Sequence, residues 1–396
     1  MRHQPRTPIY LDFQATTPVD ERVLSAMLPY FSTNYGNPAS REHLYGREAH
    51  LTVESAREKI GSAIGAKPQD ICFTSGATES INLAIKGLFF NNYEKDQHYI
   101  TVLTEHRAVL DSFRMIESDG AKVTYLPVDN QGMIDPQQIA AAIRPETIMA
   151  SVMAANNEIG VIQPIKEIGA VCRTHNILFM TDATQAFGKI KLNVQEMNID
   201  LLTCSAHKIY GPKGIGALYC RRSMPRVQLR PIISGGGHER GLRSGTLNVP
   251  GIIGFARAAE IAVKGMNAEQ TRILKLRNML HEILNKSIPD IRLNGHSERR
   301  LAGNLNLTIP GIESEALIIA LNETVAVSSG SACTTAAIEP SHVLRALGLS
   351  DTEIHSSIRI AIGRPTTKEE IEIAGKSIIA ETKRLQELCL NTGGVN

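Results

Sequence analysis

A lysine that follows an apolar stretch is the first candidate for chemistry in this sequence. Residues 199–204 predict a buried strand, and the polar run after them contains His207 and Lys208. Small and polar neighbours would leave the Lys208 amine accessible, with His207 beside it to bind an anion. Most lysines at strand ends are simply solvated, but an accessible amine here is suited to forming a Schiff base with a carbonyl compound.

A glycine turn earlier in the chain predicts an anion site. Residues 71–80 read as a strand, a tight turn at Gly76 and a helix, which Thr74 or Ser75 is expected to cap. The N–H groups and the dipole of a helix start bind phosphate, and the Thr78 hydroxyl can add a bond. The alternative is an ordinary capped helix, and the spacing matches neither the Walker nor the dinucleotide-binding glycine pattern.

Asp182 follows another apolar strand. A buried carboxylate there needs a cationic partner, and a protonated pyridine nitrogen would be one. That pairing would keep the ring protonated and make it an electron sink. The alternative is a core aspartate paired with a helix N-terminus. Together with the phosphate turn and Lys208, Asp182 completes the three anchors of pyridoxal phosphate.

Three further residues are candidates for acting on a substrate. His106 could stack on a ring and transfer protons, or be a structural histidine. Arg359 begins an apolar strand and could bind a carboxylate in a bidentate bond, or form an ion pair at the surface or between domains. Cys333 lies in a loop of small residues, which favours an exposed thiol nucleophile over a small packed residue.

The elements that must position these residues form a repeating pattern. Strand-like and helical segments alternate through the first half of the chain, which predicts an α/β fold with a mainly parallel sheet covered on both faces. His106, Asn157, Asp182 and Lys208 each follow a strand-like run. Because ligands bind beyond the carboxyl ends of such strands, we expect these side chains to share one site.

The sequence also predicts two domains. A helix over about 250–263 is followed by a second, longer helix, and the boundary is expected between them near Met266. Residues 16–265 would form the large cofactor-binding domain. Residues 1–15 and 266–396 would form a smaller α+β domain that carries the cysteine loop.

Composition narrows the class of protein. The 396 residues are 42% apolar and 21% charged, as in a globular protein with a large core, and the net charge of +2 does not indicate nucleic-acid or membrane-surface binding. The six cysteines form no CxxC pair and no disulfide spacing, which fits a reducing compartment. With no apolar signal core at its start and no run long enough to span a bilayer, the chain is expected to be cytoplasmic, and we predict no metal site.

At these residues the sequence resembles the cysteine desulfurases of the NifS/IscS type. Members of that family are pyridoxal-phosphate-dependent, belong to the class V aminotransferases and have the aspartate-aminotransferase fold (fold type I). The resemblance runs from Tyr10 to Arg384. It is carried by Thr74-Ser75-Gly76-Ala77-Thr78-Glu79-Ser80, Asn156-Asn157-Glu158-Ile159-Gly160, Asp182-Ala183-Thr184-Gln185, Ser205-Ala206-His207-Lys208, Arg243-Ser244-Gly245-Thr246 and the loop Ser328-Ser329-Gly330-Ser331-Ala332-Cys333, which is typical of the subgroup with a long cysteine loop.

The resemblance implies a role for each matching residue. Lys208 would bind the cofactor covalently and shuttle the α-proton, His106 would stack on the ring and act in acid–base steps, and Cys333 would take the substrate sulfur as a persulfide. The remaining cofactor and substrate contacts would come from Asp182 at the ring nitrogen, Gln185 at the ring hydroxyl, Ala77, Thr78, Ser205 and His207 at the phosphate, and Asn157 and Arg359 at the substrate carboxylate. Thr246 would reach the phosphate of a neighbouring subunit, which implies a homodimer.

The implied activity is removal of sulfur from L-cysteine, with L-alanine as product and a sulfur acceptor in iron–sulfur cluster assembly or tRNA thiolation. Housekeeping members dock the iron–sulfur scaffold through a longer C-terminal tail, whereas this chain ends soon after Leu388, which favours a dedicated or Nif-like acceptor. Two alternatives stay open. One is a selenocysteine lyase or aminotransferase on the same fold, and the other is a non-catalytic sulfur-relay scaffold.

Overall fold

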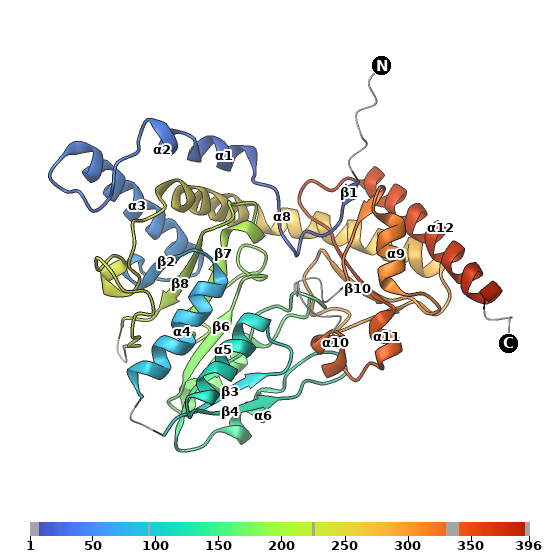
Figure 1. The fold of residues 1–396 in the computed structure, drawn as a ribbon, viewed down its shortest axis with the longest axis horizontal. Helices are drawn as coiled ribbons and strands as arrows, with labels where there is room; N and C mark the ends of the chain where they lie inside the picture. The colour runs from blue at the N-terminus through green and yellow to red at the C-terminus, as the bar shows by residue number, and fades with distance from the viewer. Residues whose placement is uncertain (1–7, 94–95, 224–225, 330–339, 393–396) are drawn as a thin grey trace.

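The computed structural model describes residues 8–93, 96–223, 226–329 and 340–392, with side chains up to Leu388. Figure 1 shows a larger and a smaller lobe, with one long helix extending across both. The larger lobe contains a mainly parallel sheet between helices, and the smaller lobe mixes antiparallel strands with helices. The predicted fold class is therefore confirmed.

The sheet of the larger lobe has seven strands. In spatial order they are β2 (Ile71–Thr74), β8 (Gly216–Cys220), β7 (Leu201–Ser205), β6 (Leu178–Asp182), β5 (Thr147–Ser151), β3 (His98–Val102) and β4 (Lys122–Leu126). Only β8 runs antiparallel to its neighbours. Most of these strands are apolar because both faces of a parallel sheet are covered.

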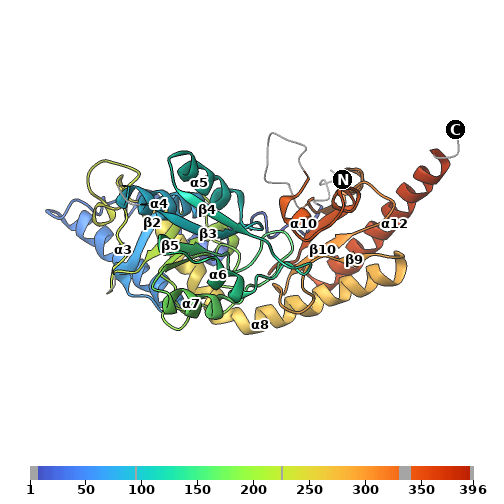
Figure 2. The same ribbon diagram turned by 90° about the horizontal axis from the view of Figure 1, so that it is seen from below.

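Helices cover the two faces of this sheet (Figure 2). One face packs against α4 (Ala77–Asn91) and α5 (Arg107–Ser118), whose buried residues include Ile81, Leu88 and Phe113. The other face packs against α3 (Leu44–Ala63), α6 (Pro136–Ala142), α7 (Ile165–Thr174) and the first half of α8 (Val249–Ser287). Two short helices, α1 (Glu21–Met27) and α2 (Pro29–Ser32), lie along α8.

The smaller lobe is built around a three-stranded antiparallel sheet. Its order is β12 (Ser357–Ala361), β10 (Asn304–Thr308) and β9 (Arg292–Leu293), and a separate pair joins β1 (Ile9–Tyr10) to β11 (Val325–Ala326). The helices are α9 (Ser314–Leu321), α10 (His342–Ala346), α11 (Asp351–His355) and α12 (Lys368–Thr392). Leu280, Leu305, Ile358 and Ile378 lie in its core. No helix in the described ranges is long and apolar enough to cross a membrane.

Helix α8 corrects one expectation. The prediction of two helices that meet near Met266 is wrong, because α8 continues without a break for 39 residues. Ile252 and Phe255 in its first half are buried in the core of the larger lobe, whereas Ile273 and Leu280 are buried in the core of the smaller one. The apolar stripe of α8 packs against the larger core in its first half and against the smaller core in its second half. This change of partner gives the sequence the pattern expected of two separate helices. The division of the chain into domains at 265/266 stays a prediction.

Candidate active site

A cavity of about 530 Å³, here called the site cavity, lies at the carboxyl ends of the parallel strands. It brings together ten of the predicted residues, which are Ala77, Thr78, His106, Asn157, Asp182, Gln185, Ser205, His207, Lys208 and Arg359. Thr246 is exposed and does not line it. Cys333 lies outside the described residues.

The start of α4 forms one end of the site cavity. The expectation that Thr74 or Ser75 caps this helix is wrong, since Gly76 is the N-cap and no side chain bonds to the first turn from that position. The Thr74 hydroxyl instead donates to the Gly76 carbonyl oxygen at 3.0 Å. The backbone N–H groups of Ala77 and Thr78 donate to no described residue. This helix start is therefore available to bind an anion.

Buried contacts hold the strand that leads into this turn. Arg57 of α3 forms two 2.7 Å bonds to Glu239, and Glu239 accepts the Phe73 N–H of β2 at 2.7 Å. The two charged side chains are only 3% and 1% exposed. On the neighbouring strand, a Cβ at Gly216 would lie 2.7 Å from the Cα of Gly76, so only glycine lets β8 pack against the turn.

Lys208 ends a single 3₁₀ turn (Ala206–Lys208) that follows β7. Its Nζ donates to the carbonyl oxygens of Gln14 at 2.6 Å and Ala15 at 2.5 Å. The neighbouring His207 lies with Nδ1 3.1 Å from the Thr16 hydroxyl. Burial, followed by the charge of Lys208, lowers the pKa of His207 to about 4, so this ring is neutral at pH 7.

The Asp182 carboxylate is anchored through one oxygen. Oδ1 accepts the Thr184 N–H at 2.9 Å, the Thr184 hydroxyl at 2.5 Å and the Thr203 hydroxyl at 3.1 Å. Oδ2 has no hydrogen bond to a described residue. The carboxylate is thus fixed in orientation while one oxygen is left for a donor in the site cavity.

His106 is both a helix cap and a cavity residue. It is the N-cap of α5, where Nδ1 accepts the Ala108 N–H at 3.1 Å. A backbone N–H can only donate, so the neutral ring carries its proton on Nε2. Burial lowers the pKa of His106, with opposing contributions from Asp182 and Lys208. The structural and the catalytic interpretations of His106 are therefore compatible.

Arg359 connects the two lobes. It lies on β12 with 1% exposure, donates from Nη2 to Asp12 at 2.8 Å and from Nη1 to the Asn157 carbonyl oxygen at 3.0 Å. The ion pair considered as its alternative role is therefore present. Its Nε and the Asn157 Oδ1 are buried without a hydrogen-bond partner. Buried polar atoms usually have partners, so these two atoms indicate a place for a ligand.

Some cavity residues were not predicted. Gln14 and Ala15 contribute backbone oxygens, which no pattern of residue types can indicate. Thr184 fixes Asp182 and lies inside a motif that already drew attention, and Thr16 similarly contacts His207. Lys189 does not line the site cavity but donates to Gln185, which does, at 3.1 Å, and its position four residues after Gln185 was the available signal.

Residues 9–373 match the aminotransferase class-V family. The chain belongs to this family. It is similar to "Cysteine desulfurase IscS" of Ehrlichia chaffeensis (52% identity, covering 98% of this chain and 94% of that protein) and to "Cysteine desulfurase" of Pongo abelii (51%, covering 96% and 83%). Among solved structures it resembles a "NIFS-LIKE PROTEIN" (TM-score 0.87, 37% identity, covering 96% and 99%) and "SspA in complex with cysteine" (TM-score 0.80, 40% identity, covering 90% and 99%).

Class-V aminotransferases of the cysteine desulfurase type are enzymes that use pyridoxal phosphate, and the residues of the site cavity fit that group. The α4 start offers N–H groups to a phosphate, and Asp182 offers Oδ2 to a protonated ring nitrogen. The unpartnered Asn157 Oδ1 lies in the same cavity. The predicted family resemblance is thus confirmed by the comparisons, while the role of each single residue stays a prediction.

Proposed function

We propose that this protein is a cysteine desulfurase that uses pyridoxal phosphate to convert L-cysteine to L-alanine and leaves the sulfur on Cys333. The observation that carries the proposal is the convergence of the Lys208 amine, the Asp182 carboxylate and the α4 start on one cavity. The similarity to named desulfurases over nearly the whole chain supports the same reaction.

Different residues of the site cavity would bind different parts of the cofactor. Lys208 would form the covalent link, Asp182 would pair with the ring nitrogen, and Gln185 would donate to the ring hydroxyl. The phosphate would be bound by the α4 start (Ala77 and Thr78), by Ser205 and by His207. When bound, the cofactor supplies an electron sink.

The chain's own residues then act on L-cysteine. Arg359 and Asn157 bind its carboxylate, and the Lys208 amine, once the amino group of the substrate has released it, accepts the α-proton. The Cys333 thiolate attacks the substrate sulfur, so that a sulfur–sulfur bond forms while the carbon–sulfur bond breaks. The electron pair of the broken bond stays with carbon, which takes up a proton to give alanine. His106, with its proton on Nε2, lies in the cavity to donate it.

The other thiols support Cys333 as the nucleophile. Cys72, Cys172, Cys204 and Cys220 are all buried in cores, and burial raises the pKa of each thiol. A buried thiol with a raised pKa is inert as a nucleophile. Of the six cysteines, only Cys333 and Cys389 lie outside the described side chains.

A homodimer accounts for two further features. Thr246 is exposed on the isolated chain, so a role at the phosphate requires that it act on the site of a partner subunit. Exposed apolar side chains gather from the residue before α2 to the middle of α3, and include Leu28, Phe31, Tyr35, Leu44 and Leu51, each at least 56% exposed. Apolar surface of this kind marks protein interfaces. The acceptor would be a protein of iron–sulfur assembly or tRNA thiolation, and the compartment the cytoplasm.

Two variants test the proposal. Wild-type protein should turn L-cysteine into equal amounts of alanine and transferred sulfur, and should show visible absorbance that borohydride bleaches. Lys208→Ala should lose both properties. Cys333→Ala should keep the absorbance but lose sulfur release, while the control Cys389→Ala should behave as wild type.

Each of the alternatives gives a different result. Sulfur release that survives in Cys333→Ala would contradict the mechanism. A keto acid formed in place of alanine would indicate an aminotransferase, and preference for selenocysteine would indicate a lyase. Absence of absorbance in wild-type protein supplied with pyridoxal phosphate would favour a non-catalytic scaffold.

A further inference from the structure

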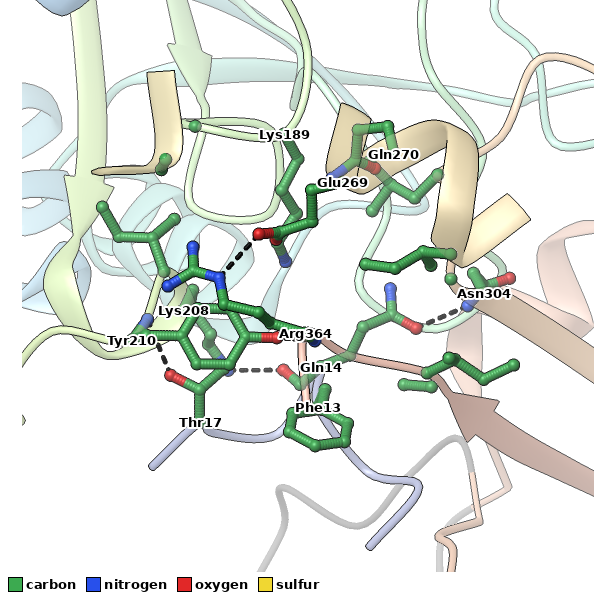
Figure 3. A pocket seen from close by; sticks show the side chains of 18 residues that line it. Phe13, Gln14, Thr17, Lys189, Lys208, Tyr210, Glu269, Gln270, Asn304 and Arg364 are labelled. Carbon is green, nitrogen blue, oxygen red and sulfur yellow. Dashed lines mark hydrogen bonds and ion pairs between the residues drawn. The ribbon is translucent and has the colours of Figure 1, made fainter. Parts of the chain in front are cut away.

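A second, smaller cavity lies behind Lys208, and we call it the rear cavity (Figure 3). Its volume of about 40 Å³ can hold roughly two or three water molecules. Its polar lining includes Gln14, Lys189, Lys208, Tyr210, Glu269 and Arg364. Lys208 lines both this cavity and the site cavity, so one side chain borders the two cavities.

The Lys189 side chain extends into the rear cavity among Glu269, Arg364 and Gln14 (Figure 3). It is connected to Lys208 by a short chain of hydrogen bonds. Lys189 Nζ donates to Gln185 Oε1 at 3.1 Å, Gln185 Nε2 donates to the Gln14 carbonyl oxygen at 2.9 Å, and Lys208 Nζ donates to that same oxygen at 2.6 Å. Two ammonium groups are thus joined through one amide and one carbonyl.

The chemistry of these donors fixes the orientation of Gln185. An ammonium group has three donors and no acceptor, so the amide oxygen of Gln185 must face Lys189. Its NH₂ group then faces Gln14 and, because Gln185 also lines the site cavity, has a second N–H left for that cavity. Lys189 is therefore placed to hold Gln185 as a donor.

The charge of Lys189 is not balanced by an ion pair with any described residue. Lys189 forms none with a described carboxylate, and Glu269, which lines the same cavity, is paired with Arg364 at 2.6 Å. Arg364 is also paired with Asp20 at 2.9 Å and lies over the Tyr210 ring.

Burial, then the positive charge of Lys208, lowers the pKa of Lys189 to about 7, against a contribution from Glu269. The charge of Lys189 also contributes to the lowered pKa of His207. Repulsion between two ammonium groups is mutual, so Lys189 must also disfavour the charged form of Lys208.

We propose that Lys189 is a positioning residue for the catalytic amine, which holds the Gln185 amide and, while it carries its proton, places a second positive charge behind Lys208 that favours the neutral form of Lys208. A neighbouring cation is an established way to activate a lysine that attacks a carbonyl group. The inference rests on the proposed function, because activation of the Lys208 amine matters only if that amine reacts with a carbonyl cofactor.

The test compares Lys189→Met with wild type in two measurements. In cofactor-free protein, acylation of Lys208 by acetic anhydride is followed against pH by mass spectrometry. In protein loaded with pyridoxal phosphate, the pH midpoint of the visible absorbance is recorded. Removal of the charge should raise both midpoints, by up to about one pH unit to the extent that Lys189 is protonated at the midpoint, since that is the usual size of a shift caused by a nearby like charge.

Matched variants separate charge from structure. Lys189→Arg keeps the charge and should keep both midpoints near those of wild type. Lys191→Met removes a lysine whose side chain is 82% exposed and should change nothing. Should Lys189→Met fail to fold, Lys189→Gln removes the charge and still offers a donor to Gln185.

The outcomes also distinguish this inference from the proposed function. If wild-type protein gains no absorbance with the cofactor, the proposed function fails, yet the acylation midpoints still decide the role of Lys189. If wild type gains absorbance but the neutral variants keep the wild-type midpoints, the inference about Lys189 is wrong. An equal shift in Lys189→Arg would overturn it as well.

Discussion

Two walls of the site cavity are built in different ways. The first, which we call the phosphate wall, consists of Gly76, Ala77, Thr78, Ser205 and His207, all within a few residues of strands of one sheet. The second, the inter-lobe wall, consists of Gln14, Asn157 and Arg359. Its members come from the N-terminal segment, from a loop after β5 and from a strand of the other lobe.

The difference lies in what holds each wall in place. The phosphate wall depends on backbone groups fixed by the sheet and by the buried Arg57–Glu239 pair beneath β2. The inter-lobe wall depends on side chains that reach across the molecule, such as Arg359 to the Asn157 carbonyl oxygen. The first wall is held within one sheet, whereas the second exists only while the lobes stay together.

The largest expected effect concerns Asp182, which lies between the two walls. Asp182→Asn keeps an oxygen that can accept the same three donors, so the protein should fold normally. Loss of the negative charge should lower kcat for alanine formation by roughly a hundredfold to a thousandfold, as for other preorganised electrostatic groups. The exposed Asp96→Asn is the control, and an unchanged kcat would contradict the role given to Asp182.

The next effect concerns the support of the phosphate wall. Glu239→Gln leaves the Arg57 guanidinium buried without its carboxylate, which should reduce the free energy of unfolding by about 3 kcal/mol in urea titrations. Glu54, which also contacts Arg57 but is 37% exposed, provides the control. Glu54→Gln should cost less than about 1 kcal/mol. Equal losses in the two variants would show that the buried pair has no special part in holding β2.

A pH effect tests the inter-lobe wall. Glu158, next to Asn157, lies 2.5 Å from the Ser341 hydroxyl, and its backbone oxygen accepts from Asn304 at 2.9 Å. Burial raises the pKa of Glu158 to about 7. At pH 5 the folded protein keeps the proton while the unfolded chain loses it, so raising the pH favours unfolding.

The free energy of unfolding should therefore fall by about 2 kcal/mol between pH 5 and pH 7 on account of this one group. Glu158→Gln should remove that part of the pH dependence, as measured by urea titration at both pH values. The exposed Glu167→Gln should keep the slope of wild type. A slope that persists in Glu158→Gln would contradict the assignment.

The smallest effect concerns Thr246, which would extend the phosphate wall with a residue from a second subunit. Thr246→Ala should weaken pyridoxal phosphate binding about tenfold, the typical loss of one hydrogen bond to a charged group. Titration of the cofactor-free protein measures this, with the exposed Thr174→Ala as control. If the affinity for pyridoxal phosphate is unchanged, Thr246 does not contribute to the phosphate wall of a second subunit.

The sequence predicted the phosphate wall better than the inter-lobe wall, for a physical reason. Ala77 and His207 follow β2 and β7 within three residues, and strands that run in the same direction bring such positions to one edge of a sheet. In the inter-lobe wall Asn157 and Arg359 were predicted, whereas Gln14 reaches the site only through the packing of distant segments and acts through its carbonyl oxygen. The continuous α8 was missed because one helix serves two cores, so its apolar pattern does not follow a single face.

This shared helix links the stability of the two lobes. If the smaller lobe unfolded alone, the second half of α8 would lose the packing around Leu280 while remaining covalently continuous with a folded first half. Because most helical stability in proteins comes from tertiary packing, that half would fray toward the larger core. The two cores are therefore cooperative, and a substitution deep in one lobe is expected to lower the unfolding midpoint of both.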